Sequence, residues 1–387
     1  MNSHNEAAAL IPAPLRGITV LDFSWLLPGP YCSLLLAELG ATVIKIEGPG
    51  GDYARELLPG MFKAANHGKL GLSIDLKSAG SLDVIDRLVK QSDVVLEGFR
   101  PGVTDRIGIG YQRLAAINPG LVYASVSGFG ASGPAAQRPG HDLNYCAAAG
   151  VMAIPGRWDD PPARSGLPIG DLTAGLHAAL AIVAALRERD RSGRGGYLDA
   201  SMFASLLHLA QMRFADFDAT GDRPWHHVNP LNDIFEAADG RRITLALVER
   251  KFWLGFCDRV GLLDPGIQSD FDLFAKTGDR DTGLRLRTAV EAIIAQRTAA
   301  EWVELLSHSD VPFNVALSPE EALRQPQTDH SGLVEIVEDG LPIVRFCVGG
   351  FERTAYSMAP QRGQHNDEIL ARFGFSADEI AGLKLTS

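Results

Sequence analysis

The sequence contains few cysteines, and their spacing fits neither a metal site nor a disulfide framework. Cys32, Cys146, Cys257 and Cys347 are scattered through 387 residues without a C-x-x-C pair. Zinc sites and redox motifs need such closely spaced pairs. We therefore expect no bound metal and a reducing compartment, the cytoplasm.

Long apolar and long basic segments are missing too. The most apolar stretch, residues 174–186, is shorter than the roughly 20 residues that cross a bilayer, so we expect a buried helix and no membrane association. Residues 1–14 lack the basic and apolar regions of a secretory signal. No long basic block occurs and the formal net charge is −11, which argues against nucleic-acid binding. Any anionic ligand must then be held by local positive groups.

What the chain does contain is the composition of a globular protein, with 46% hydrophobic and 21% charged residues. Its length suggests two domains or one large domain with an insertion. Up to about residue 126, short β-branched stretches alternate with helical ones. We expect strands at 17–24, 41–47, 70–76, 93–99 and 120–127, and helices at 29–40 and 79–91. This alternation predicts an α/β fold with a Rossmann-like parallel sheet.

The pattern changes near Asp216. A β-hairpin with its turn at Asp239-Gly240 precedes several helical segments, and the tail contains two strand-like stretches and two short helices. We predict a large Rossmann-like domain at 1–215 and a smaller α+β domain at 216–326. The segment 327–387 is expected to return to the large domain.

A glycine-rich loop, "GFGASG" at 128–133, has the spelling of a dinucleotide-binding motif. That motif needs a helix directly after the glycines, and an acidic residue about 20 positions later. Pro134 and a second turn follow here instead. We therefore expect neither NAD nor FAD as a cofactor.

Two long helices are predicted to begin with groups that can move protons. "RPGHDLNYCAAAG" places His141 and Asp142 after a Pro/Gly turn, and "SGLPIGDLTAGL" places Asp171 in the same way. Taken singly, such residues are more often helix caps or turn residues than catalysts. Together, an imidazole and a carboxylate are the usual acid/base partners near neutral pH. Glu249, at the end of an expected strand, could orient the imidazole.

The chain resembles the family III CoA-transferases, the CaiB/BaiF family, over nearly its whole length. The stretches similar to that family are "LRGITVLDFSWLLPGPYCSLLLAELGATVIKIEGP", "NHGKLGLSIDLK", "SDVVLEGFRPGVTDRIGIG", "SGRGGYLDASM" and "APQRGQHNDEIL". The family also contains α-methylacyl-CoA racemases. "GHDLNY" differs from the racemase stretch only at Leu143, where those enzymes have Ile, so the resemblance is closest to the racemases.

The resemblance implies inversion of the α-carbon of a 2-methyl-branched acyl-CoA, with the CoA thioester as substrate and no other cofactor. His141 and Asp171 would be the acid/base pair, backbone N–H groups at the helix start would stabilise the enolate, and Glu249 and Asp142 would fix the histidine tautomer. In transferases similar to this chain, the aspartate matching Asp171 is instead a nucleophile that attacks the thioester. A catalytically silent binder of CoA thioesters is the third alternative.

Two absences favour the racemase. The glycine-rich loop of the transferases has no counterpart in residues 216–330, and Leu27 replaces a glutamine typical of formyl-CoA transferases. Leu26, Leu27 and Phe99 are expected to flank the adenine of CoA.

Phosphate contacts are less well marked. Lys69, Arg100 and Arg106 are expected to meet the CoA phosphates, although each reads equally well as a solvated surface charge. Gly48 and Leu70 stand where the family has basic residues. The resemblance further implies an interlocked homodimer, whereas the acyl group is not indicated by any motif.

Overall fold

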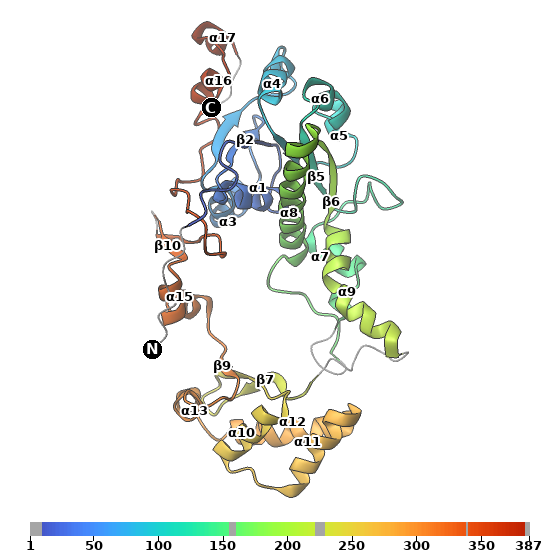
Figure 1. The fold of residues 1–387 in the computed structure, drawn as a ribbon, viewed down its shortest axis with the longest axis vertical. Helices are drawn as coiled ribbons and strands as arrows, with labels where there is room; N and C mark the ends of the chain where they lie inside the picture. Colours follow the sequence, from blue (N-terminus) through green and yellow to red (C-terminus); the bar gives the residue numbers. More distant parts are fainter. Residues whose placement is uncertain (1–9, 155–159, 221–228, 338–339, 384–387) are drawn as a thin grey trace. The chain divides into compact units, whose positions relative to one another are not determined.

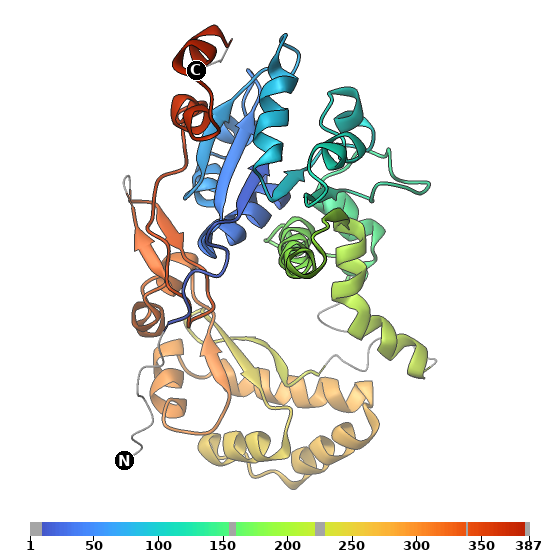
Figure 2. The ribbon, with the colours of Figure 1, turned by 45° about the horizontal axis from the view of Figure 1, so that its top comes forward.

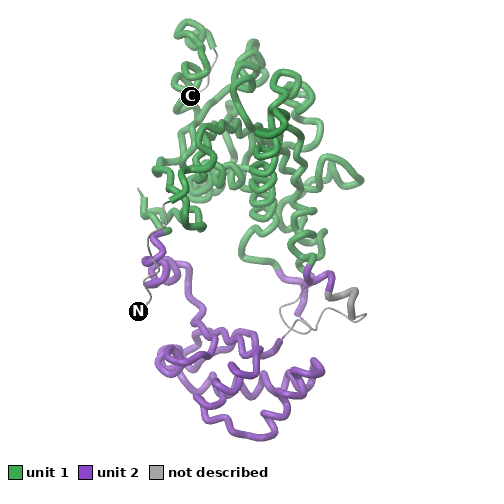
Figure 3. The backbone as a smooth tube through the Cα atoms, viewed as in Figure 1, with its two compact units in different colours: residues 1–152, 164–211, 333–387 green, residues 153–163, 212–332 purple. Residues whose placement is uncertain are grey.

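The protein is described by a computed structural model that covers residues 10–154, 160–220, 229–337 and 340–383. It divides into two compact units (Figure 3). Unit 1 comprises residues 1–152, 164–211 and 333–387, and unit 2 comprises residues 153–163 and 212–332. The sequence-based boundaries, after residues 215 and 326, lie a few residues from the divisions after residues 211 and 332. The assignment of residues 153–163 to unit 2 had no signal in the sequence.

Unit 1 is built on a six-stranded parallel sheet with the strand order β3-β2-β1-β4-β5-β6 (Figure 1). Its strands are β1 (Thr19–Asp22), β2 (Thr42–Glu47), β3 (Leu70–Ser73), β4 (Val94–Glu97), β5 (Val122–Ser127) and β6 (Gly196–Ser201). This is the strand order of a Rossmann-type sheet. Strands β1 to β3 are added toward one edge and β4 to β6 toward the other, so the topological switch point lies between β1 and β4. The predicted α/β fold with a parallel sheet is confirmed.

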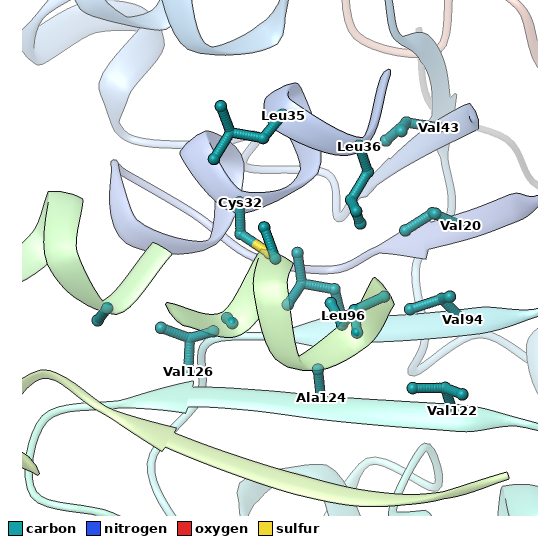
Figure 4. Packing of buried hydrophobic residues seen from close by; sticks show 14 of the residues in the cluster. Val20, Cys32, Leu35, Leu36, Val43, Val94, Leu96, Val122, Ala124 and Val126 are labelled. Atoms are coloured by element: carbon teal, nitrogen blue, oxygen red, sulfur yellow. The ribbon is translucent and has the colours of Figure 1, made fainter. Parts of the chain in front are cut away.

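Helices cover both faces of this sheet because the strands carry apolar residues on both. On one face, Val20, Val94 and Val122 occupy neighbouring strands in register and pack with Cys32 and Leu36 of α1 (Figure 4). On the other face, residues such as Leu21 pack against α4 and α6. Strands buried on both sides read as continuous apolar runs, which is why their positions were predictable.

The helices of unit 1 follow the strands in βαβ order. Their bounds are α1 (Pro28–Glu38), α2 (Ala54–Leu57), α3 (Pro59–Asn66), α4 (Ser81–Lys90), α5 (Val103–Arg106), α6 (Tyr111–Ile117), α7 (Asp142–Ala148), a 3₁₀ turn (Val151–Ala153), α8 (Ile169–Ser192) and α9 (Met202–Thr220). The prediction of two long helices near His141 and Asp171 was half wrong. The second is the long helix α8, but α7 ends at Ala148 before the chain turns at Gly150.

Helix α8 is long and apolar enough by composition to cross a membrane. In the structure, however, it packs against α1, β5 and β6, and its small residues, including Ala174, Gly175 and Ala178, are buried. A Cβ on Gly175 would lie 2.6 Å from the carbonyl oxygen of Pro28. The glycine therefore allows α8 to approach α1 closely. The expected helix at 174–186 is confirmed, but it is buried on one side only, since Leu176 and Leu180 are exposed.

Unit 2 combines a small antiparallel sheet with helices. The sheet contains β7 (Asn232–Glu236), β8 (Arg242–Ala246) and β9 (Phe313–Val315), and the predicted hairpin turns at Asp239-Gly240. The helices are α10 (Arg250–Val260), α11 (Pro265–Thr277), α12 (Arg280–Ile294), α13 (Ala299–Leu306), α14 (Pro319–Ala322) and α15 (Pro326–Ser331). Trp253 and Trp302 are fully buried in its separate hydrophobic core.

The chain from Leu333 onward belongs to unit 1, as the strand-like tail suggested. Strands β10 (Val334–Ile336) and β11 (Pro342–Val344) pair antiparallel, and α16 (Asn366–Arg372) and α17 (Ala377–Gly382) end the chain beside the sheet (Figure 2). Helix α16 packs on the edge strand β3, where His365 Nδ1 accepts the N–H of Gly71 and Asn366 Oδ1 accepts that of Ser73. These bonds satisfy part of an exposed strand edge.

Candidate active site

A cavity of about 180 Å³ in unit 1 opens at the carboxyl ends of β1, β4 and β5, beside the starts of α1, α7 and α8. Both His141 and Asp171 line it. Its other lining residues are Trp25, Leu26, Pro28, Gly29, Gly98, Phe99, Arg100, Pro101, Val126, Ser127, Gly128, Ala136, Arg138, Gly140, Tyr145 and Met202. Ligands of open α/β sheets bind at this edge, near the point where the strand order reverses.

His141 is held by the geometry of a helix start. It is the N-cap residue of α7 with an extended backbone, φ −126° and ψ 175°, and its N–H donates to Asn144 Oδ1 at 3.0 Å. The Tyr145 hydroxyl donates to the carbonyl oxygen of Gly140 at 2.7 Å and fixes the preceding turn. His141 is an exposed residue that lines the cavity, and its side chain also forms a capping box with Asn144.

Asp171 lies in the first turn of α8 and is half-buried. The residue that joins it to α7 is Asp142, whose Oδ1 accepts the N–H groups of Gly170 at 2.7 Å and Asp171 at 3.2 Å. These bonds tie the starts of the two helices together. They also occupy the N–H groups of Gly170 and Asp171, so these two donors are not free to stabilise an enolate, and they engage Asp142 with α8 as a cap. The predicted role of Asp142 in fixing the histidine tautomer stays a prediction.

The surroundings of Asp171 favour its protonated form. Burial, with the nearby carboxylate of Asp142 as a second cause, raises the pKa of Asp171 to about 7. Among the residues that the structure describes, no ion pair is found for Asp171. A carboxyl group with a pKa near the working pH can both donate and accept a proton.

Three of the expected binding residues, Leu26, Phe99 and Arg100, also line this cavity. Sequence reasoning missed two residues that lie with them, Trp25 and Arg138. Trp25 makes an edge contact with Phe99 at 5.8 Å between ring centroids. Arg138 stood in the same "RPGHDLNY" stretch as His141, so a positive group three positions before the histidine was the available signal.

Lys69 is not available to a phosphate, and its assignment as a ligand contact is withdrawn. Its side chain is fully buried, and Nζ donates to Asp22 Oδ2 at 3.2 Å, to the carbonyl oxygen of Pro30 at 2.9 Å and to Asn66 Oδ1 at 2.8 Å. An ammonium group has three N–H donors, and all three are used inside the protein. The burial could not be predicted from the sequence, because lysines are rarely buried unless they are paired and no partner of Lys69 could be identified from the sequence.

Three further predicted residues lie outside the cavity lining. Leu27 is buried as the N-cap residue of α1, and Arg106 is exposed at the end of α5. Glu249 lies in unit 2, where it is exposed as the N-cap residue of α10, just after β8. Its position near a strand end matches the expectation, whereas its predicted contact with His141 stays a prediction.

A second cavity, of about 370 Å³ and mostly apolar, shares Trp25 and Phe99 with the first. It lies at the carboxyl ends of β1, β2 and β4, and Gly48 is part of its lining. The two cavities therefore meet at an aromatic pair.

The glycine-rich loop at 128–133 is followed by turns, and the next helix begins only at Asp142, so the dinucleotide motif lacks its helix here.

Comparisons with known proteins show the family of the chain. The sequence model of CoA-transferase family III matches residues 15–366. The acetyl-CoA:oxalate CoA-transferase of Acetobacter aceti is 34% identical over 81% of this chain and 84% of its own length. The human alpha-methylacyl-CoA racemase is 31% identical over 95% of each chain. The crystal structure of a CaiB/BaiF family protein from Brucella suis superposes with a TM-score of 0.80 at 27% identity, covering 93% of this chain and 99% of that one.

Proposed function

The chain belongs to CoA-transferase family III, the CaiB/BaiF family, and we propose that within this family it is an acyl-CoA racemase that inverts the α-carbon of a 2-methyl-branched acyl-CoA. The observation that supports this most is the pairing in one cavity of His141 with an aspartate whose pKa is raised to about 7. A transferase needs its aspartate ionised as a nucleophile, so a raised pKa suits proton transfer better.

The chemistry needs a base and an acid on opposite faces of one carbon. A thioester carbonyl acidifies the adjacent C–H bond, because the electron pair left behind is delocalised onto the carbonyl oxygen. In one direction the Asp171 carboxylate removes the α-proton and the His141 imidazolium returns a proton to the other face. In the reverse direction neutral His141 removes the proton and protonated Asp171 supplies it, so each turnover leaves the pair ready for the opposite reaction.

CoA binding is assigned to the two cavities that meet at Trp25 and Phe99. The apolar second cavity suits an uncharged part of the cofactor, whereas Arg100 and Arg138 are the cations that line the first. In a chain with a net charge of −11, such local positive groups are what an anionic thioester needs. Gly48 stands where the family has an arginine. A Cβ at this position would meet no atom within 4 Å, so steric hindrance does not explain why glycine is found here.

Glu249 enters this proposal through a second copy of the chain. We infer a homodimer, as the family resemblance implied, in which unit 2 of one subunit supplies Glu249 to the His141 of the other. Exposed apolar residues support a covered face on unit 1, since Leu176 and Leu180 of α8 and Leu209 of α9 are 52%, 66% and 54% exposed. Apolar groups gathered in this way mark interaction surfaces. Sedimentation at increasing dilution would test the dimer.

The activity is tested with a single enantiomer of a 2-methylacyl-CoA. Racemisation followed by chiral chromatography, across a panel of fatty, sterol-derived, aromatic and short dicarboxylic acyl groups, is expected to identify one class of substrate. The absence of inversion throughout the panel, with tight CoA-thioester binding retained, would instead support the silent binder.

The rival function is acyl transfer with Asp171 as nucleophile. It is favoured by the transferases among the relatives, such as that of Acetobacter aceti. In this case the Asp171 carboxylate attacks the thioester and CoA leaves as a thiolate, so the acyl group becomes a mixed anhydride with the enzyme. Hydroxylamine would trap it as a hydroxamate. His141→Ala would then change the rate far less than Asp171→Asn.

A further inference from the structure

The turn that leads from β1 into the start of α1, residues 24–29, contains a backbone conformation that its sequence does not favour. Leu26 has φ 64°, and among the residues that the structure describes it is the only one other than glycine with a positive φ. A side chain with a Cβ is unfavourable in this left-handed region, and such conformations persist only where the surroundings hold them. The question is what holds Leu26.

The holding group is the carboxylate of Asp52. The N–H of Leu26 donates to both of its oxygens, at 3.0 Å to Oδ1 and 3.2 Å to Oδ2, and Oδ1 also accepts the N–H of Ala54 at 2.9 Å. Lys45 completes the arrangement, because its Nζ donates to Asp52 Oδ2 at 2.8 Å and to the carbonyl oxygen of Ser24 at 3.0 Å. The side chains of Lys45 and Asp52 are fully buried.

One buried ion pair therefore forms hydrogen bonds with the turn at two points. Lys45 holds the carbonyl oxygen of Ser24, and Asp52 holds the N–H of Leu26, two residues later along the chain. The end of the turn is equally tight, since a Cβ on Gly29 would lie 2.2 Å from the Cβ of Ser24. Only glycine allows the chain to double back this closely.

This turn is also a wall of the candidate active site. Trp25, Leu26, Pro28 and Gly29 line the cavity that contains His141 and Asp171. We propose that Asp52, supported by Lys45, is a positioning residue for the reaction: it holds Leu26 in the left-handed conformation and thereby fixes the wall against which the acyl-CoA is placed. The nature of the reaction rests on the proposed function, but the positioning itself does not.

The first test does not depend on any activity. Leu26→Gly and Leu26→Ala both remove the leucine side chain and differ only in backbone preference. At an ordinary position the alanine variant is the more stable, because glycine loses more freedom on folding. At a left-handed position the order reverses. We expect the glycine variant to unfold at the higher temperature, and equal or opposite midpoints would overturn the proposal.

The second test asks whether the conformation matters for turnover. Asp52→Ala is expected to lower kcat by roughly 10²-fold, the scale of a wall displaced by about 1 Å. In the Asp52→Ala background, adding Leu26→Gly is expected to restore kcat by about tenfold over adding Leu26→Ala. A merely structural role for Asp52 would show no difference between these two second substitutions, and that result would contradict the proposal.

The variants also separate this proposal from the proposed function. Should the wild-type protein transfer acyl groups without racemising them, the same glycine-alanine comparison is made on hydroxamate formation. Should Asp52→Ala fail to fold because Lys45 is left buried and unpaired, the order of stability of Leu26→Gly and Leu26→Ala in the otherwise unchanged chain remains decisive.

Discussion

Asp22 and Asp171 belong to the same unit, and their surroundings drive their acidity in opposite directions. Asp22, at the end of β1, is fully buried, and although burial alone would raise its pKa, the ammonium groups of Lys69 and Lys45 leave that pKa below its usual value. Asp171 is desolvated beside a second carboxylate, and its pKa rises to about 7. The same type of side chain is thus held as an anion at Asp22, whereas at Asp171 the protonated form is favoured.

The difference lies in the partners that the sequence provides. Asp22 also accepts bonds from Ser24 and Ser33, so its negative charge is satisfied several times over. The charged group that acts on the pKa of Asp171 is the carboxylate of Asp142, which raises this pKa and accepts N–H groups at the start of α8. Buried charges with partners are part of the scaffold, whereas a carboxyl group with a raised pKa in a cavity, such as Asp171, is a candidate for a functional group.

The largest effect on stability is expected for Asp22→Asn. This change leaves the buried ammonium of Lys69 without its anion, and breaking a buried pair in this way costs about 3–5 kcal/mol. The free energy of unfolding in urea at pH 7 measures the loss. The double variant Asp22→Asn/Lys69→Met removes both charges and should recover much of it. An unchanged stability for the single variant would mean that Asp22 is not an anion in the folded protein.

The same substitution at the other aspartate is expected to act in the opposite sense. The folded-state pKa of Asp171 lies near 7, above its ordinary value of 3.8, so the wild-type protein loses stability as the pH rises between these values. The loss is up to about 1.4 kcal/mol per pH unit. Asp171→Asn does not titrate and should therefore be more stable than wild type at pH 8, with no such advantage at pH 4. Equal denaturation curves at both pH values would contradict the raised pKa.

A smaller effect is expected for Asp142→Asn. The amide oxygen can still accept the N–H groups of Gly170 and Asp171, but the like charge is gone. The pKa of Asp171 should fall without reaching 3.8, because burial, its first cause, remains. The acidic limb of the profile of kcat/KM against pH should therefore move to lower pH. An acidic limb at the same pH or at higher pH would show that the charge of Asp142 does not raise the pKa of Asp171.

The smallest effect is expected for a pair that solvent screens. Arg16 and Glu352 are 3.3 Å apart with side chains 72% and 47% exposed. Glu352→Gln should change the free energy of unfolding by less than about 1 kcal/mol. A loss of unfolding free energy as large as that of Asp22→Asn would mean that the buried pair does not contribute more to stability than the exposed pair.

Much of unit 1 could be predicted from the sequence because its strands are apolar on both faces and its helices are closed by glycines, as at Gly40. The position of Asp171 was predictable for the same reason, since a Pro/Gly turn precedes a long apolar helix. The short helix α7 was not, because an alanine-rich stretch such as 147–149 does not show where a helix stops. The burial of Lys69 depends on Asp22, Pro30 and Asn66, which only the fold brings together.

For the candidate site, the residues that line the cavity were easier to predict than the contacts that hold its backbone. His141, Asp171, Leu26, Phe99 and Arg100 share one cavity, whereas the resemblance implied separate contacts with the α-carbon, the adenine and the phosphates. The engagement of Asp142 with α8 and the left-handed Leu26 were beyond reach, because both depend on contacts between distant segments. Side chains that face a ligand leave a local signal, whereas those that hold the backbone do not.

The most direct test of the central claim follows hydrogen exchange at the α-carbon in D₂O, starting separately from each enantiomer of a 2-methylacyl-CoA. Wild-type protein is expected to invert both and to introduce deuterium. His141→Ala should still exchange the α-proton of one enantiomer, the one that faces Asp171, without inverting it, and Asp171→Asn should exchange only the other, with inversion reduced roughly 10²–10⁴-fold in both variants. Exchange of both enantiomers by His141→Ala at the wild-type rate, or of neither by the wild-type protein, would contradict a proton passed between these two residues.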